Sequence, residues 1–183
     1  MTWQLDSSHS QIQFTVRHLM ISKVRGFFDE FSMDLDYDEE HPENSSVVVT
    51  VNTGSANTRD QQRDAHLRAA DFFDVENYPT ATFESTRVEV TGENKGKIYG
   101  DLTIRDVTKE VVVDAQYLGM ATDPWGTQHA HFSGSTAIDR RDWGLEWNQG
   151  LDTGGVLAGW KVQLDFEVEL VNVAEQQPAE AAA

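Results

Sequence analysis

Cysteine is absent from the 183 residues of this chain. Its absence excludes disulfide bonds, a thiol nucleophile and thiolate metal sites. A cysteine-free sequence fits a cytoplasmic protein, although secreted proteins without cysteine are also common. The length is enough to bury a sizeable core in one domain.

Long apolar runs are absent too. No stretch approaches the roughly 18 consecutive apolar residues of a membrane helix, so we expect no stable membrane insertion. The N-terminus reads MTWQLDSSHS and lacks the basic start and apolar run of a secretory signal. We therefore expect a cytoplasmic location, and a periplasmic one fits if the sequence is a processed form.

Basic residues are few: 14 lysines and arginines stand against 31 aspartates and glutamates, which gives a formal net charge of -17. A chain this acidic repels nucleic acid and anionic membrane surfaces, so we expect no nucleic-acid partner. A well-solvated surface explains the acidic residues. Adaptation to a salty cytoplasm is the alternative explanation.

The dominant pattern in the sequence is alternation with a period of two, which is typical of strands with one apolar face. The clearest example runs from Trp160 to Leu170. One face of this strand is apolar: Trp160, Val162, Leu164, Phe166, Val168 and Leu170. The intervening residues are Lys161, Gln163, Asp165, Glu167 and Glu169. A helix would scatter both sets around its circumference.

The same alternation recurs along the chain and predicts about eight or nine strands. Segments rich in Gly, Pro, Asn and Asp separate them and predict turns, for example residues 40–44, 92–96, 106–109 and 123–126. Regularly spaced strands with short turns favour an antiparallel sandwich or barrel. Closure into a barrel would protect the long last strand from exposing an edge. We therefore predict an all-β, antiparallel barrel.

Two segments lack this alternation. Residues 58–74, TRDQQRDAHLRAADFFD, predict one or two short helices, capped by Asn57 or Thr58, which could cover one barrel mouth. Residues 174–183 consist of Ala, Glu, Gln and Pro and predict a disordered tail. The barrel domain is therefore expected to span residues 1–173.

The predicted interior mixes large and small residues. Such a mixture fits a core filled by its own side chains as well as it fits a cavity. The rows that face inward carry no cluster of acids, bases or amides, so a cavity would accept a lipid or another long hydrocarbon. The predicted cavity wall comprises Phe14, Val16, Phe27, Phe31, Phe83, Leu102, Trp160, Leu164 and Phe166. His18 ends its strand on the apolar face and is the candidate for contact with a ligand head group.

Four segments carry a family resemblance. DSSHSQIQFTVRHLMISKVRGFF, RDAHLRAADFFDVENYPTATFEST, GDLTIRDVTKEV and IDRRDWGLEW resemble, in order and spacing, signatures of the YceI-like family, from Trp3 to about Leu170. The resemblance implies a lipocalin-like barrel, an apolar pore that holds a polyisoprenoid such as an isoprenoid quinone, and a homodimer. Family members are often exported to the periplasm. Asp106 and Glu110 depart from the glycine and proline usual in the family's turn, which bears on loop geometry.

Six histidines are the remaining candidates for chemistry. His129 and His131 form an H-x-H pair whose side chains point the same way on a strand, and such a pair binds zinc if a third ligand arrives. His18 and His66 could act as acid and base, or could be tied by hydrogen bonds near the barrel mouth. Ser10 and its neighbour His9 would face opposite sides of a strand, so they cannot form a dyad.

We therefore predict no catalytic residues, no metal site and no cofactor. A carrier protein for an isoprenoid lipid is the leading hypothesis. A hydrolase or isomerase that uses His18, His66 or the H-x-H pair, with or without zinc, is the first alternative, and a stress-related structural or interaction protein with a filled core is the second. Trp143 and Trp147, near Arg140 and Asp142, could line the cavity, form a dimer interface, or plug one end of the barrel.

Overall fold

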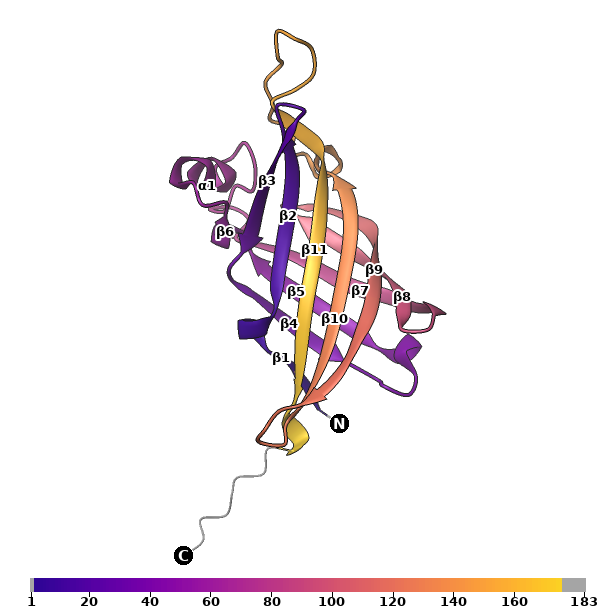
Figure 1. The fold of residues 1–183 in the computed structure, drawn as a ribbon. Helices are drawn as coiled ribbons and strands as arrows, with labels where there is room; N and C mark the ends of the chain where they lie inside the picture. The colour runs from indigo at the N-terminus through magenta and orange to yellow at the C-terminus, as the bar shows by residue number, and fades with distance from the viewer. Residues whose placement is uncertain (1, 176–183) are drawn as a thin grey trace, which may run out of the picture.

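The computed structural model describes residues 2–175, which form one antiparallel sheet of 11 strands curled into an elongated barrel (Figure 1). The strands are β1 (Trp3–Leu5), β2 (Gln11–His18), β3 (Ser22–Phe28), β4 (Phe31–Asp36), β5 (Ser46–Asn52), β6 (Ala56–Asn57), β7 (Thr80–Gly92), β8 (Lys95–Ile104), β9 (Val107–Thr122), β10 (Gln128–Asp139) and β11 (Ala158–Asn172). The predicted all-β fold is confirmed. The two strands β1 and β6 are too short to produce a detectable alternation.

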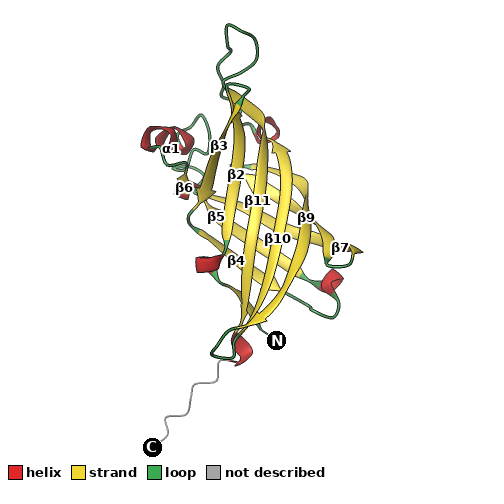
Figure 2. Ribbon diagram, viewed as in Figure 1, coloured by secondary structure: helices red, strands yellow, loops and turns green. Residues whose placement is uncertain are grey.

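The helical elements are short and lie outside the sheet (Figure 2). They are α1 (Gln61–Arg68) and the 3-10 turns η1 (Ser7–His9), η2 (Pro42–Asn44), η3 (Thr53–Ser55), η4 (Arg140–Trp143) and η5 (Val173–Glu175). The predicted helical segment therefore contains one α-helix. No helix within residues 2–175 is long and apolar enough to cross a bilayer.

The order of strands explains why the sheet closes. Along the sheet the order is β4-β5-β7-β8-β9-β10-β11-β2-β3-β6, so β4 is at one end and β3 is next to the other, followed only by the two-residue β6. Yet only Asp29 and Glu30 separate these two strands in the chain. A two-residue link cannot span a flat sheet of this width. The sheet must therefore curl until its two ends meet, with β1 attached to β11.

Two buried apolar clusters lie toward the two ends of the barrel. The first, the η4 cluster, comprises Ile104, Val111, Ile138, Trp143 and Leu145. The second, the β1 cluster, comprises Trp3, Ala130 and Leu170. Ile138 and Ala130 stand at opposite ends of β10, so the length of the barrel separates the two clusters.

Three local predictions need correction. The N-cap of α1 is Asp60, whose carboxylate accepts a hydrogen bond from the Arg63 amide, and neither Asn57 nor Thr58 caps the helix. The turn predicted over residues 106–109 is a two-residue turn at Arg105 and Asp106, because β9 begins at Val107. Ala174 and Glu175 belong to η5, and the rest of the predicted tail, residues 176–183, lies outside the described residues.

Candidate functional site

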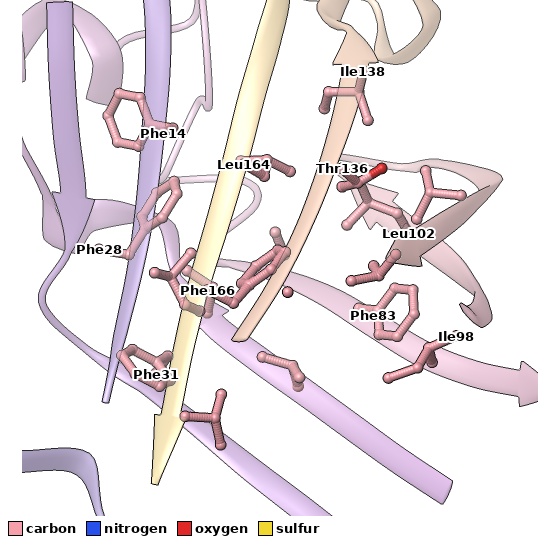
Figure 3. Close-up of a pocket in the computed structure, with 18 of the residues that line it drawn as sticks. Phe14, Phe28, Phe31, Phe83, Ile98, Leu102, Thr136, Ile138, Leu164 and Phe166 are labelled. Carbon is pink, nitrogen blue, oxygen red and sulfur yellow. The ribbon is translucent and has the colours of Figure 1, made fainter. Parts of the chain in front are cut away.

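A cavity of about 800 Å³ runs through the barrel between its two ends. This volume lies within the roughly 300–1,000 Å³ of typical ligand pockets. The side chains at its centre are almost all hydrocarbon, and they come from strands on every side of the barrel (Figure 3). Those labelled in the figure are Phe14, Phe28, Phe31, Phe83, Ile98, Leu102, Thr136, Ile138, Leu164 and Phe166.

One wall of the cavity is a row of aromatic rings. The ring centroids of Phe14 and Phe28 lie 5.2 Å apart, and those of Phe28 and Phe73 lie 5.7 Å apart. Gly26 stands opposite Phe14 on the neighbouring strand, and a side chain there would collide with the Phe14 ring. The glycine therefore lets Phe14 lie flat against the strand rather than across the cavity.

Most residues predicted to line the cavity do so. Phe14, Val16, His18, Phe31, Phe83, Leu102, Leu164 and Phe166 all contribute to its wall. Their placement follows from the alternation within each strand, because inward and outward positions cannot exchange without a shift of register. Whether each residue contacts a ligand stays a prediction.

Phe27 was predicted to face inward, and the structure contradicts this. It lies opposite Gln13 on the outer face of the barrel, beside a shallow depression, and Phe28 lines the cavity in its place. The prediction grouped Phe27 with Phe31 as if one strand held both. A turn at Asp29 and Glu30 separates them, and a turn resets which residues face inward.

Trp160 was also predicted to face inward and does not line the cavity. The pairing of β11 with β2 shifts register between Ala158 and Val162, so the regular alternation begins only at Val162. The Trp160 ring instead packs against two guanidinium groups, with the Arg140 carbon 4.5 Å and the Arg141 carbon 4.7 Å from its centroid.

The end of the cavity near the η4 cluster carries positive charge. Arg140 lines the cavity although only 5% of its surface is exposed. Its guanidinium donates to four backbone carbonyls: Nε to Gly159 at 2.9 Å, Nη1 to Leu145 at 2.6 Å and to Trp147 at 2.9 Å, and Nη2 to Ala158 at 3.3 Å. Burial lowers the pKa of this group, but an arginine still carries its charge.

His18, Arg63 and His66 line the same end of the cavity. His18 pairs with Ala158, whose carbonyl binds Arg140. Arg63 donates to the Thr58 hydroxyl at 2.7 Å, and the His66 ring lies 4.5 Å from the ring of Trp147. Helix α1 and η4 therefore place cationic and titratable groups around one end of an apolar cavity. The prediction that residues 58–74 cover one barrel mouth is confirmed, because Arg63 and His66 of α1 line this end of the cavity.

The two tryptophans after Arg140 have different roles. Trp143 is buried, and its indole N–H donates to the Leu102 carbonyl at 2.9 Å, so it plugs the barrel end as part of the η4 cluster. Trp147 lines the cavity. Trp143 therefore fits the predicted plug, and Trp147 fits the predicted cavity wall.

Aromatic residues line the opposite end of the cavity. The Tyr37 ring packs edge-on against Phe132, with centroids 5.3 Å apart, and against Trp3 at 6.0 Å. Burial raises the pKa of the Tyr37 hydroxyl to about 12. Trp3 in turn donates to Glu39 at 3.0 Å. The lining of this end combines these aromatic rings with polar and charged residues: Asp36, Glu39, Asn94, Lys95 and Gln116.

The H-x-H pair lies on the outer surface of the barrel. His129 binds Glu169 through Nδ1 at 2.7 Å and Asp123 through Nε2 at 3.1 Å, and the His131 Nδ1 lies 3.5 Å from Glu169. Hydrogen bonds with Asp123 and Glu169 raise the pKa of His129. The pair therefore does not face the cavity. Of the histidines considered for acid–base chemistry, His18 and His66 line the cavity.

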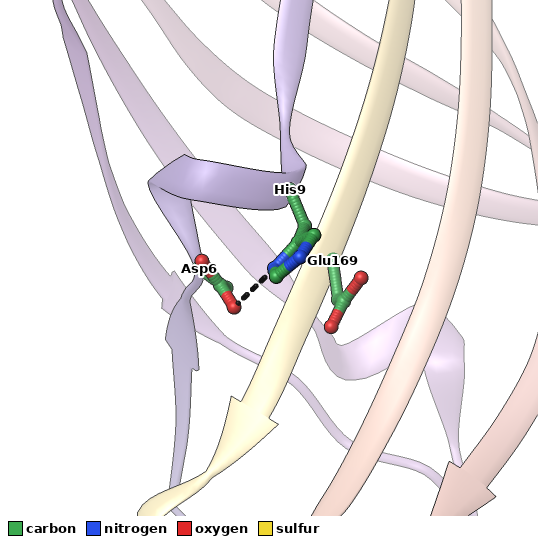
Figure 4. Close-up of side chains that lie close together, drawn as sticks. All are labelled: Asp6, His9 and Glu169. Carbon is green, nitrogen blue, oxygen red and sulfur yellow. Dashed lines mark hydrogen bonds and ion pairs between the residues drawn. The ribbon is translucent and has the colours of Figure 1, made fainter. Parts of the chain in front are cut away.

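Asp6 and His9 lie beside the same Glu169 (Figure 4). The His9 Nδ1 is 2.9 Å from the Asp6 carboxylate, and this contact raises the pKa of His9. Hydrogen bonds from Ser8 and His9 lower the pKa of Asp6 to about 2. One ligand atom from each of Asp6, His9 and Glu169 lies within 4.8 Å of the others, so a metal ion would find donors here. Ser10 contacts the Glu169 backbone at 2.9 Å and not the His9 ring.

Sequence reasoning missed part of the cavity wall. The missed residues include Val24 and Phe28 on β3, and Arg63, Phe72 and Phe73 on the segment after β6. Alternation counted forward from Val24 through Gly26 would have found Phe28. The residues of the helical segment follow no such pattern, because their contact with the cavity depends on how that segment folds over the barrel.

Comparison with known families and structures adds an independent line of evidence. A family model described as the YceI-like domain matches residues 3–170. A UPF0312 protein of Vibrio cholerae is 41% identical over 139 residues, which are 76% of this chain and 74% of the relative.

Solved structures show the same fold. The YceI protein of Campylobacter jejuni is 34% identical, with a TM-score of 0.74, over 94% of this chain and 98% of that one. A protein described as a polyisoprenoid binding domain from Saccharophagus degradans has a TM-score of 0.64 at 16% identity, over 92% of this chain and 97% of that one. The second likeness shows the fold alone.

Proposed function

The chain belongs to the YceI-like domain family, and on this premise we propose that it is a non-enzymatic carrier protein for an isoprenoid lipid, either a polyprenyl chain or an isoprenoid quinone. The cavity of about 800 Å³ with its hydrocarbon wall is the observation that carries the proposal. The description of the Saccharophagus degradans domain as polyisoprenoid-binding supports it. A cavity of this volume also argues against a filled core.

The wall of the cavity suits a long hydrocarbon chain. Each buried methylene contributes about 0.8 kcal/mol, so ten carbons contribute about 8 kcal/mol before the entropy of binding is subtracted. The aromatic row of Phe14, Phe28 and Phe73 offers flat contacts to the methyl-branched, unsaturated units of a prenyl chain. Few polar groups at the centre would have to give up water when the chain enters.

The polar end of the cavity sets the orientation of the ligand. Arg63, His66 and Arg140 offer positive charge or N–H donors, and His18 lies beside them. A head group rich in acceptor oxygens, such as a quinone or a phosphate, is stabilised by such donors. The chain would then run toward Tyr37 and Phe132 at the aromatic end.

Lipid extraction tests the proposal. The protein is purified from its own host without detergent and extracted with organic solvent, and the extract is analysed by mass spectrometry. We expect a prenyl lipid in near-stoichiometric amount. Protein that is repeatedly lipid-free and that takes up no prenyl quinone from micelles would refute the proposal.

The cellular location and the oligomeric state belong to the same proposal. We propose a cytoplasmic homodimer. Cell fractionation tests the location, and sedimentation velocity tests the dimer. A monomer at micromolar concentration would rule out the dimer and leave lipid binding untouched.

A further inference from the structure

The hairpin of β2 and β3 differs in charge from the rest of the molecule. Residues 7–28, which include both strands, contain no aspartate or glutamate, although the chain carries 31. No other stretch of this sequence without an acid is as long. The same hairpin carries Arg17, Lys23 and Arg25.

These three cations share the outer face of the hairpin. Arg17 lies directly opposite Lys23, and Arg25 lies directly opposite Thr15. One pair of inward-facing residues, Val16 and Val24, separates these two outward-facing pairs. All three residues are exposed. None of them forms an ion pair with a carboxylate within residues 2–175. Their charge is therefore available to an anionic surface.

The tip of this hairpin is apolar and exposed. Leu19, Met20 and Ile21 are 44%, 56% and 81% exposed. The turn is closed by a hydrogen bond from the Ile21 amide to the His18 carbonyl at 3.1 Å. Leu19 and Met20 occupy this turn with φ of 52° and 66°, a left-handed conformation that favours asparagine and glycine. The turn geometry therefore does not explain the presence of apolar side chains here.

The tip stands at the polar end of the cavity. The Leu19 amide donates to the Leu157 carbonyl at 2.9 Å, and both His18 and Leu157 line the cavity. Figure 1 shows the β2–β3 hairpin and the loop before β11 rising together at the end of the barrel opposite the chain termini. A surface that held this tip would face the end of the cavity that carries Arg140.

We propose that the hairpin docks on an anionic phospholipid bilayer, with Leu19, Met20 and Ile21 inserted among the head groups and Arg17, Lys23 and Arg25 against the phosphates. Apolar side chains next to cations are the combination that binds such an interface. The overall charge of -17 repels an anionic membrane, so approach is favoured at the acid-free hairpin that carries these cations. The proposal rests on the proposed function for its purpose, which is to bring the cavity to the membrane that holds the lipid.

Vesicle sedimentation with the full chain tests the docking. Vesicles of phosphatidylcholine with and without phosphatidylglycerol are compared at low and high salt. We expect binding to the anionic vesicles only, weakened by salt because the cations are exposed. The variant R17Q/K23Q/R25Q should bind these vesicles about tenfold more weakly or worse.

A second variant separates docking from folding. L19N/M20G/I21S removes the apolar tip and supplies the turn residues that the left-handed conformation favours. It should therefore fold at least as well as the parent and lose vesicle binding. W125S is the matched control, because Trp125 is 87% exposed on the β9–β10 turn beside the carboxylate of Asp123. We expect W125S to bind vesicles like the parent.

Three outcomes would overturn the docking. The first is that the parent protein does not bind anionic vesicles, and the second is that L19N/M20G/I21S binds them as the parent does. The third is that the tip variant turns a dimeric parent into a monomer, which would identify the tip as an interface between two copies. Uptake of prenyl quinone from detergent micelles distinguishes the two proposals, because the tip variant should retain it even though vesicle binding is lost.

Discussion

The substitution A115L provides a sharp test of the cavity. Ala115 lines the cavity on β9, and its neighbours across the sheet are Gly96 on β8 and Gly134 on β10, which line it too. A leucine at this position therefore faces no side chain at the two directly paired positions and projects into the cavity. The three added carbons occupy space that the hydrocarbon chain of a ligand would otherwise fill.

The expected loss of affinity follows from the displaced hydrocarbon. If three methylenes of the ligand are forced out of the cavity, the loss is about 2.4 kcal/mol, or about 50-fold in affinity. The stability of the unliganded protein should change by less than about 1 kcal/mol, because the new side chain enters a cavity and does not displace packed atoms. Loss of binding without loss of stability is therefore the signature of a cavity.

Two measurements check this expectation. Affinity for a prenylated benzoquinone is read from quenching of tryptophan fluorescence, since Trp147 lines the cavity, and stability is read from urea unfolding. A137L is the control, because Ala137 is exposed on the outer face of β10 and the same change there should affect neither quantity. Unchanged affinity in A115L would refute the reasoning, as would a loss of stability above about 2 kcal/mol, which is the cost of overpacking a filled core.

Three further predictions concern stability. R140Q should cost about 3 kcal/mol in urea unfolding, because it strips donors from buried carbonyls, whereas R141Q should be nearly neutral, because Arg141 is exposed and solvent screens its ion pair with Asp139. G100A should destabilise by about 1–3 kcal/mol, because its new methyl group would lie 2.6 Å from the Glu84 carbonyl oxygen and against the Phe83 ring; G150A is the control, because its new methyl group meets open space without a left-handed backbone, so it should change stability little. The lowered pKa of Asp6, about 2 against the ordinary 3.8, contributes stability above pH 4 that is lost as the pH falls through about 2, and D6N should remove this acid-dependent loss. The raised pKa values of His9 and His129 act in the opposite sense, so their contribution is full below about pH 6.5 and is lost as the pH rises through their folded values.

Alternation predicted inward residues reliably inside one regular strand. Leu164 and Phe166 were placed correctly because successive side chains of a strand must point to opposite faces. Phe27 and Trp160 were misplaced because a turn and a register shift interrupt the strands that contain them. Nothing in the local composition marks the residue at which the count restarts.

The helical segment shows a similar limit. Asn57, Thr58 and Asp60 are all residues that cap helices, so the sequence offers several candidates for the first turn. Thr58 instead donates its hydroxyl to the Asp64 carboxylate at 2.6 Å and accepts from Arg63. Contacts formed after folding decided among candidates that were locally equivalent.

By itself the sequence determined the all-β class, the apolar face of each long strand and the membership of the YceI-like domain family. These properties depend on residues that are neighbours in the chain or on motifs that can be compared directly. Only the tertiary structure decided that the barrel holds a cavity of about 800 Å³ and that Arg63, His66 and Arg140 meet at one end of it. Cavity volume depends on how far the sheet curls, and the charged end joins segments far apart in the chain, so no local pattern contains either.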